Sequence, residues 1–274
     1  MSESPGQPRA VYRHTLGARF GHWLWALSIL VLVMSGLQIF NAAPYLDASD
    51  KSDVAHRVLW FRAALVNGHP VGTTTVFGHS FVTTNVFGYT DDGEHGEAPR
   101  AFPGWMTLPG EQDLADGRLW HFFFAWMLVL AMFVYLVTAA ARGSLRELLL
   151  RPSDLPKLWP MQAYYLRLRK TPPPHGTYNP LQKAAYTLVL FVLFPLVVVT
   201  GLALSPGIDA TLPWLTQVFG GRQFARLWHF VFMGILVVYT FGHLLLVVTT
   251  GAWNNVRSMI TGWYVLGRYD GVGP

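Results

Sequence analysis

Cysteine is absent from the 274 residues of this chain. Without thiolates the protein holds no cysteine-bound iron–sulfur cluster, no zinc–cysteine site, no thioether-attached cofactor and no disulfide. Charge is also scarce, because Asp, Glu, Lys and Arg make up 13% of the chain, whereas ordinary soluble domains contain about 25%. The scarcity of charge argues against an ordinary soluble fold.

Four long stretches contain none of these charged residues: Phe20–Leu46, Leu119–Ala141, Ala184–Ile208 and Leu227–Val256. Each exceeds the roughly 20 residues that a helix needs to span a bilayer. The first is too long for a secretory signal peptide and lacks a small-residue cleavage site. We therefore predict an all-α membrane protein with a single domain over residues 1–274, a four-helix transmembrane bundle. The expected helices cover about 20–41, 118–141, 181–204 and 224–250, and Pro195 is expected to kink the third.

The distribution of Lys and Arg predicts the orientation of the bundle. Segments 1–19, 142–183 and 257–274 hold thirteen of the 20 basic residues, whereas segments 47–118 and 209–226 hold seven. The positive-inside rule then places both termini in the cytoplasm, so we expect a multi-pass membrane protein with both ends on the inner side. The net charge of +5 follows from this topology and does not indicate nucleic-acid binding.

The connection between the first two helices, residues 42–117, is too long for a simple loop. We expect it to be a structured extracytoplasmic insertion. Within it, Val54–Val66 is interpreted as a short helix on the membrane surface. The local repeat formed by Thr73–Gly78 and Thr83–Gly88 favours two short strands or extended loops, because it is rich in β-branched residues and ends in glycine.

One pattern occurs three times where a polar stretch meets an uncharged one: an Arg followed three residues later by a His. The copies are Arg19–His22, Arg118–His121 and Arg226–His229. The Arg lies on the same helical face as the His, one turn nearer the water. This arrangement suits a haem, whose iron binds imidazole and whose propionate meets a guanidinium. Alternatively, such a histidine forms an interhelical hydrogen bond and such an arginine reaches lipid headgroups.

A fourth histidine, His243, follows His229 by fourteen residues, which places it about 21 Å deeper on the same helical face. Helices 2 and 4 run inward and helix 1 runs outward. Depth therefore pairs His121 with His229 near the outer side and His22 with His243 near the inner side. We predict two haem b groups, each with two axial histidines and therefore suited to electron transfer. Gly36, level with the outer pair, would leave room for the haem or pack helices.

A larger repeat relates the two halves of the chain. Gly117–Phe122 resembles Ala225–Phe230, and Ser35–Leu37 resembles Thr200–Leu202. Helices 1–2 and 3–4 are therefore expected to be two related pairs. In this comparison Tyr135 occupies the position that corresponds to His243, and Thr187 the position that corresponds to His22.

The other histidines give weaker signals. His14 is an alternative to His22 as a ligand. His69, His79 and His95 could be imagined as a metal site, but their spacing matches no strong motif. We expect these three to lie in loops or on the surface.

These motifs together resemble the bacterial dihaem cytochrome b561 family, which includes the cytochrome b subunits of nickel-iron hydrogenases and formate dehydrogenases. The resemblance is strongest to the thiosulfate-reductase-type cytochrome b subunit. It is carried by Tyr12–His14, Arg19–Trp23, Ser35–Phe40, Tyr178–Gln182, Gly220–His229 and Asn255–Gly262. It implies that His22 and His243 hold the inner haem and that His121 and His229 hold the outer one. It also implies quinone exchange and a separate catalytic subunit outside the membrane, often containing molybdenum.

Three functions remain open from the sequence. The first is an electron-transfer subunit that links quinone to an extracytoplasmic, molybdenum-containing oxidoreductase, with the outer segment as its docking surface. The second is a stand-alone membrane oxidoreductase that exchanges electrons between quinone and a small extracytoplasmic molecule such as superoxide. The third is a haem-free scaffold or transporter. Quinone is expected near the inner haem, with His14, Arg19 and Tyr178 as contacts.

Overall fold

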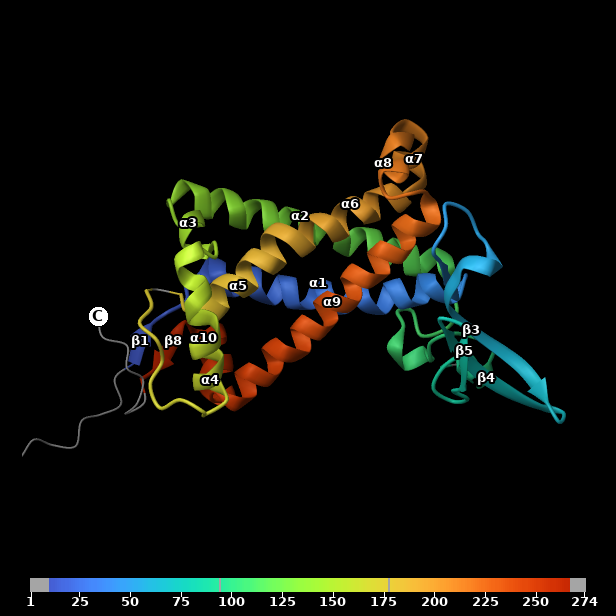
Figure 1. Cartoon of the computed structure of the whole chain (residues 1–274), viewed down its shortest axis with the longest axis horizontal. Helices are drawn as coiled ribbons and strands as arrows, with labels where there is room; N and C mark the ends of the chain where they lie inside the picture. Colours follow the sequence, from blue (N-terminus) through green and yellow to red (C-terminus); the bar gives the residue numbers. More distant parts are fainter. Residues whose placement is uncertain (1–9, 94, 177, 267–274) are drawn as a thin grey trace, which may run out of the picture.

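The computed structural model describes residues 10–93, 95–176 and 178–266. Four long helical segments run along the long axis of the molecule, and a sheet lies at one end of them (Figure 1). We refer to this end as the sheet end and to the opposite end, where the described chain begins and finishes, as the termini end. Each of the four segments is long and apolar enough to cross a membrane, as the sequence predicts.

Three of the spans are single α-helices and the third in sequence is composite. The single helices are α1 (Leu16–Asn41), α2 (Leu114–Ala141) and α9 (Arg222–Thr249); the composite span consists of α5 (Pro180–Leu188), the π-helical turn η4 (Val189–Leu193) and α6 (Phe194–Leu204). The π-helical turn precedes Pro195, which has no N–H to donate to the helical ladder. The predicted interruption at Pro195 is thus a widened turn within a continuous span.

Local chemistry sets where the spans begin, and so the depth of the histidines within them. The carboxylate of Asp113 accepts hydrogen bonds from the first turn of α2, and Asn179 forms a reciprocal capping box with Gln182 at the start of α5. Helix α9 starts after Gly221, whose φ is 103° and whose Cβ, if present, would lie 2.6 Å from the Cα of Asp50. Only glycine fits this close approach.

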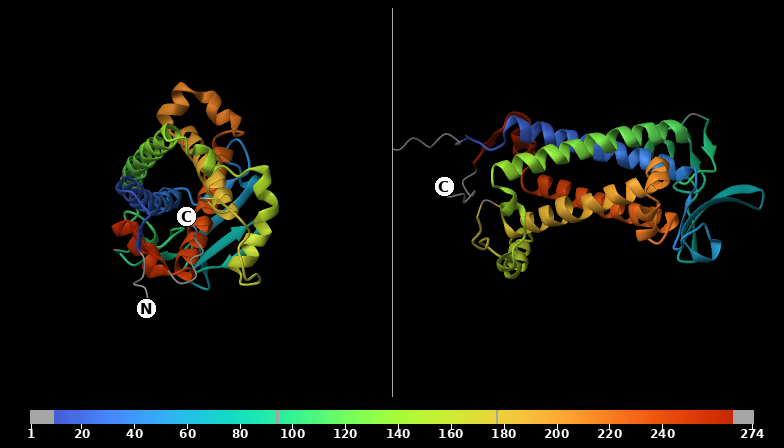
Figure 2. Two further views of the ribbon diagram at one scale, coloured as in Figure 1. Left: turned by 90° about the vertical axis from the view of Figure 1, so that its left-hand side faces the viewer. Right: turned by 90° about the horizontal axis from the view of Figure 1, so that it is seen from above.

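The spans form two helix pairs that face each other. Helix α1 packs along α2, and α6 packs along α9. Figure 2 shows the first pair, in blue and green, beside the second, in orange and red. Aromatic contacts bridge the pairs: Trp25 stacks on Phe194 at 5.6 Å, and Phe40 meets Phe230 at 5.2 Å between ring centroids. This is the arrangement expected for a duplicated helix pair.

The segment between α1 and α2 contains a four-stranded antiparallel sheet. Its strands, in spatial order, are β2 (Tyr45–Asp47), β3 (Arg57–Val66), β4 (His69–Val76) and β5 (His79–Val82). The predicted helix over 54–66 is therefore wrong, because only the 3₁₀ turn η1 (Val54–His56) is helical. Asn67 and Gly68 both have positive φ, the conformation of a two-residue hairpin turn, and this turn pairs β3 with β4.

The predicted local repeat has two different structures. Thr73–Val76 lies in β4 and ends in a second turn of this kind at Phe77 and Gly78, with φ values of 46° and 82°. Thr83–Gly88 forms turns beyond β5. The glycine that closes each copy has a positive φ in both, 82° at Gly78 and 84° at Gly88.

Short elements complete both ends of the molecule. At the sheet end they are β6 (Thr90–Asp91), β7 (Glu97–Ala98), η2 (Gly104–Met106), α7 (Pro206–Thr211) and α8 (Pro213–Val218). At the termini end they are β1 (Ala10–Tyr12), α3 (Leu145–Leu148), η3 (Pro152–Lys157), α4 (Leu158–Tyr165), α10 (Ala252–Thr261) and β8 (Trp263–Val265). Strand β1 pairs antiparallel with β8.

An aromatic core attaches the sheet to the end of the bundle. Phe61 of β3 lies 5.9 Å from Phe40 of α1 and 5.2 Å from Phe102, measured between ring centroids. All three are buried. Each such aromatic pair contributes about 1 kcal/mol beyond the burial of its area, so β3 is held firmly against the end of α1.

Arg100 organises the irregular chain that follows the sheet. Only 2% of it is exposed. Its guanidinium donates to the carbonyls of Asp92, Phe102 and Gly110 and to the hydroxyl of Thr107, at 2.6 to 3.0 Å. Burial lowers the pKa of Arg100, but a guanidinium remains protonated in proteins. A single buried cation thus connects the stretches around Asp92, Phe102 and Gly110.

Candidate functional site

Four histidines face one another in two pairs inside the bundle. The ring centroids of His121 on α2 and His229 on α9 are 6.2 Å apart, and those of His22 on α1 and His243 on α9 are 6.3 Å apart. The structure thus brings together the two pairs that the sequence assigns to a common depth. We refer to His121 and His229 as the sheet-end pair and to His22 and His243 as the termini-end pair.

The separation of the rings fits one metal ion between the members of each pair. A first-row metal binds imidazole nitrogen at about 2 Å, and the nitrogen lies about 1 Å from the ring centre, so two axial imidazoles have centres about 6 Å apart. A direct hydrogen bond between two rings would bring the centres to about 5 Å. Among the described residues no such bond joins either pair. The spacing therefore favours shared ligation over a hydrogen-bonded pair.

Each ring of the sheet-end pair is hydrogen-bonded to the neighbouring helix of its own helix pair. Nδ1 of His121 lies 3.1 Å from the hydroxyl of Ser35 on α1, and Nδ1 of His229 lies 3.0 Å from the hydroxyl of Thr200 on α6. These contacts leave Nε2 as the nitrogen available to a metal. Sequence reasoning missed both hydroxyls as functional contacts, although the repeat of Ser35–Leu37 at Thr200–Leu202 pointed to equivalent positions.

A glycine beside each hydroxyl makes room for the imidazole. A Cβ built on Gly36 would lie 3.4 Å from Cε1 of His121, and one built on Gly201 would lie 3.2 Å from Cε1 of His229. The space at Gly36, interpreted from the sequence as room for a haem, lies against a candidate ligand. The hydroxyl and glycine residues together form a cradle for each ring.

The termini-end pair has different surroundings. Nδ1 of His22 is buried and has no hydrogen-bond partner within the described part of the chain. The ring of Tyr239 stacks on His243 at 6.4 Å with an interplanar angle of 19°. His14, the alternative ligand, has no ring contact with another histidine among the described residues. Burial lowers the pKa of His14, and the charge of Arg13 lowers it further.

The three arginines of the repeated pattern differ in their contacts. The guanidinium of Arg19 donates to a carbonyl of α10, and its Nε is buried without a partner among the described residues. That of Arg226 donates to the carbonyl of Ala43, just after α1. That of Arg118 lies 5.7 Å from the ring centroid of Phe122. A guanidinium carries five N–H donors, so these contacts leave donors for an acidic group.

The histidines of the outer segment do not form a cluster. His56 is 2.6 Å from Asp53, and His95 is 3.5 Å from Asp92. His69 and His79 begin different strands. Within residues 10–93, 95–176 and 178–266, no three His, Cys, Asp or Glu side chains form a metal-binding group. The two histidine pairs are thus the candidate metal-binding sites of the described chain.

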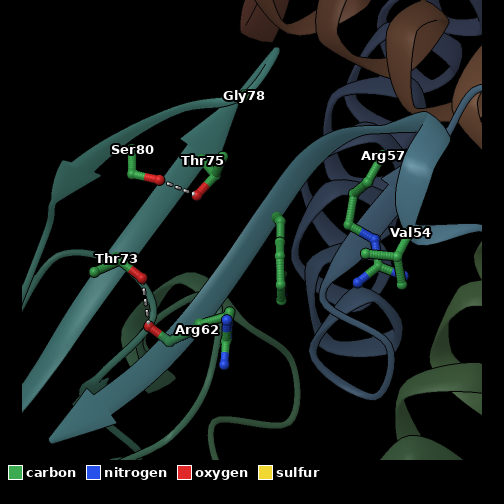
Figure 3. A pocket seen from close by; sticks show the side chains of 8 residues that line it. Val54, Arg57, Arg62, Thr73, Thr75, Gly78 and Ser80 are labelled. Atoms are coloured by element: carbon green, nitrogen blue, oxygen red, sulfur yellow. Dashed lines mark hydrogen bonds between the residues drawn. The ribbon is translucent and has the colours of Figure 1, made fainter.

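The sheet carries a concave surface on the face opposite the aromatic core. A cavity of about 370 Å³ is lined by Val54, Arg57, Trp60, Arg62, Thr73, Thr75, Gly78 and Ser80 (Figure 3). Trp60 and Arg62 share this face because they are two residues apart on β3. The guanidinium of Arg57 is fixed by Asp47 at 2.8 Å and lies over Trp60. Sequence reasoning missed this surface because it assigned these residues to a helix.

The chain matches known proteins over most of its length. A family model described as prokaryotic cytochrome b561 matches residues 13–262. No solved structure is significantly similar to the chain.

Two curated relatives are redox subunits by name. A protein of Azospira oryzae, provisionally named as protein-methionine-sulfoxide reductase subunit YedZ1, is 24% identical over 85% of this chain and 89% of its own. A protein of Azotobacter vinelandii, provisionally named as a Ni/Fe-hydrogenase B-type cytochrome subunit, is 31% identical over 57% of this chain and 73% of its own.

Proposed function

Because the chain belongs to the prokaryotic cytochrome b561 family and is thus a membrane cytochrome b of electron transfer, we propose that it holds two haem b groups. His121 and His229 hold one, and His22 and His243 hold the other. The observation that carries this proposal is the separation of 6.2 and 6.3 Å between the paired rings. Bound in this way, haem would supply one-electron transfer.

The chain's own residues position the two proposed haem groups and neutralise the charge of their propionates. Helix α9 contributes one histidine to each site and spaces the two sites by about 21 Å along its axis. Arg19, Arg118 and Arg226 lie one turn from a histidine and have guanidinium donors for haem propionates. Their positions near helix ends suit a negatively charged edge that would be unfavourable deeper in the hydrocarbon.

In the proposed orientation both termini lie in the cytoplasm of a bacterial cell and the sheet end lies outside it. The support is the excess of Lys and Arg in the segments at the termini end. The protein then carries electrons between the quinone pool and an extracytoplasmic catalytic subunit. Two relatives with reductase-subunit and hydrogenase-subunit names support such a partner. We propose a molybdenum-containing oxidoreductase, as the family resemblance implies.

Quinone is proposed to bind beside the termini-end pair, where phenol groups gather. Tyr239 stacks on His243, and the ring of Tyr178 lies 5.2 Å from that of Tyr186. Phenol hydroxyls can donate a hydrogen bond to a quinone oxygen or accept one from a quinol. His14 and Arg19 lie at the same end of α1 and remain proposed contacts.

A kinetic experiment tests the quinone site. We expect Tyr178→Phe and Tyr239→Phe to slow the reduction of the cytochrome by added quinol at least several-fold, without changing haem content. Tyr164→Phe, on α4, is the matched control. Equal rates in all three variants would argue against this location.

The catalytic partner is proposed to dock on the cavity face of the sheet. Trp and Arg are the residues most enriched at the energetic centres of protein interfaces. Here Arg57 and Arg62 both lie over the ring of Trp60, with guanidinium carbons 4.9 and 4.4 Å from its centroid. A partner with acidic groups opposite Arg62 would fit this face.

Co-purification from the native membrane tests the assignment as a subunit. A catalytic oxidoreductase should be recovered with the wild-type chain and with the exposed control Lys51→Glu, and be lost with Trp60→Ala and Arg62→Glu. Recovery of the chain alone, with quinol-linked turnover of superoxide, would instead favour the stand-alone oxidoreductase.

A further inference from the structure

A hydroxyl–glycine dipeptide recurs at the same level on α1 and α6. Ser35 and Gly36 lie against the ring of His121, and Thr200 and Gly201 lie against the ring of His229. Helix α6 donates no histidine to either pair, so this contact is its direct contribution to the sheet-end site. The same hydroxyl–glycine dipeptide thus contacts both rings of the sheet-end pair, once from each helix pair.

The direction of these hydrogen bonds follows from the other contacts of the hydroxyls. Ser35 Oγ lies 2.6 Å from the carbonyl oxygen of Val31, and Thr200 Oγ1 lies 2.7 Å from that of Leu196. A carbonyl can only accept, so each hydroxyl donates its proton to the helix backbone. The hydroxyl oxygen must then accept from the imidazole, which makes the ring nitrogen at Nδ1 the protonated one. Nε2 keeps its lone pair for a metal.

The termini-end pair lacks this support on α1. His22 is on the same helix as Ser35, but its Nδ1 is buried and has no hydrogen-bond partner among the described residues. The two sites therefore differ in how their histidines are oriented, although the spacing of their rings is the same within 0.1 Å, at 6.2 and 6.3 Å.

We propose that Ser35 and Thr200 are positioning residues that fix the tautomer of His121 and His229 and lower the reduction potential of the sheet-end haem. The inference rests on the proposed ligation of that haem. A hydrogen bond from Nδ1–H raises the basicity of a metal-bound imidazole. A more basic ligand favours the oxidised, more positively charged iron. Removing the hydroxyl therefore raises the potential of this site and leaves the other unchanged.

A redox titration of the full-length protein in lipid nanodiscs, followed by absorption, tests the proposal. Ser35→Ala and Thr200→Ala should each shift the ratio of oxidised to reduced haem at the sheet-end site about threefold toward reduced, about 30 mV at 59 mV per tenfold. The double variant should shift it about tenfold. Ser35→Thr and Thr200→Ser keep the hydroxyl and should retain the wild-type value.

Ser28→Ala is the matched control, because Ser28 lies on α1, is fully buried and has no hydrogen-bond partner among the described residues. Unchanged potentials in both alanine variants, or equal shifts in Ser28→Ala, would overturn the proposal. Loss of the sheet-end haem from Ser35→Ala but not from Ser35→Thr would support it, whereas loss from both would contradict it.

A second measurement separates this inference from the proposed function. If the wild-type protein bound no haem, the proposed ligation would fail. ¹⁵N NMR of labelled histidine in that protein would still report which ring nitrogen is protonated. Protonation of Nδ1 in His121 and His229 that is lost in the two alanine variants would support the cradle. Protonation of Nε2 in the wild type would overturn it.

Discussion

A methyl group added at Gly201 should displace His229 and weaken the sheet-end site. The Cβ of Gly201→Ala would lie 3.2 Å from Cε1 of the ring. Ordinary carbon–carbon contacts begin at about 3.5 Å, so the imidazole must move by roughly 0.3 Å or more. Metal–ligand distances tolerate only about 0.2 Å. We therefore expect the affinity for the sheet-end haem to fall by about 10- to 100-fold, the range seen when the support of a ligand is disturbed.

Two further variants test whether the effect depends on how closely the added methyl group approaches the imidazole. At Gly36 the corresponding distance to His121 is 3.4 Å, so Gly36→Ala needs a shift of only about 0.1 Å, within the tolerance of the bond. It should have a smaller effect than Gly201→Ala. Gly234→Ala on α9 is the control, because nothing lies within 4 Å of its added Cβ.

The assay is haem content per polypeptide, together with the rate of haem transfer to an excess of apomyoglobin. Gly201→Ala should lose the sheet-end haem fastest, Gly36→Ala more slowly and Gly234→Ala at the wild-type rate. Equal retention in Gly201→Ala and wild type would refute the reasoning. Equal loss from the Gly234→Ala control would refute it too, since the effect would then not depend on the imidazole.

Other changes test the fold around the site. Arg100→Met should destabilise the segment after the sheet by about 3 kcal/mol or more, because it leaves several buried acceptors unpaired; hydrogen exchange should rise there, and unchanged protection would contradict the role given to Arg100. The ammonium of Lys183, 3.0 Å away, holds the pKa of Asp154 below its usual value of 3.8. A lowered pKa stabilises the folded state above 3.8 and loses this effect as the pH falls below it. Asp154→Asn should therefore lower the melting temperature at pH 7, and the difference should close on acidification; a difference independent of pH would exclude this pair as the cause. Phe61→Ala should cost about 3 to 5 kcal/mol and detach the sheet, measured as protease cleavage within β3, whereas Phe81→Ala on the exposed β5 should not.

The membrane-spanning helices and the pairing of the histidines could be predicted from the sequence, because both depend on the spacing of residues along the chain. Runs without charge long enough to cross a bilayer require helices, and helical rise converts the fourteen residues between His229 and His243 into a depth. The order of the helices along the chain then decides whether each helix runs inward or outward. The position of each histidine along its helix is thus almost fixed before any side-chain packing is considered.

The secondary structure of the outer segment could not be predicted in the same way. The run from Val58 to Val66 is nearly all apolar, and such a run suits a buried helix or a strand equally well. The decisive signal was the Asn67–Gly68 turn, which matches hairpin geometry. The cavity with Arg57 and Trp60 depends in turn on the pairing of these strands.

The contacts of Ser35 and Thr200 could not be derived from spacing alone. They depend on how α1 is rotated against α2, and α6 against α9, which is decided by packing along the whole helices. The equivalence of the two dipeptides was visible in the repeat. The structure adds that both hydroxyls lie beside imidazole nitrogens.

Quantification of haem in the purified protein and in two variants of α9 tests the main proposal most directly. We predict two haem b groups per chain in the wild type and one each in His229→Ala and His243→Ala. The two variants should retain different haems, distinguished by their potentials. A wild type without b-type absorption bands, or two variants that both keep two haems, would contradict ligation by these histidine pairs.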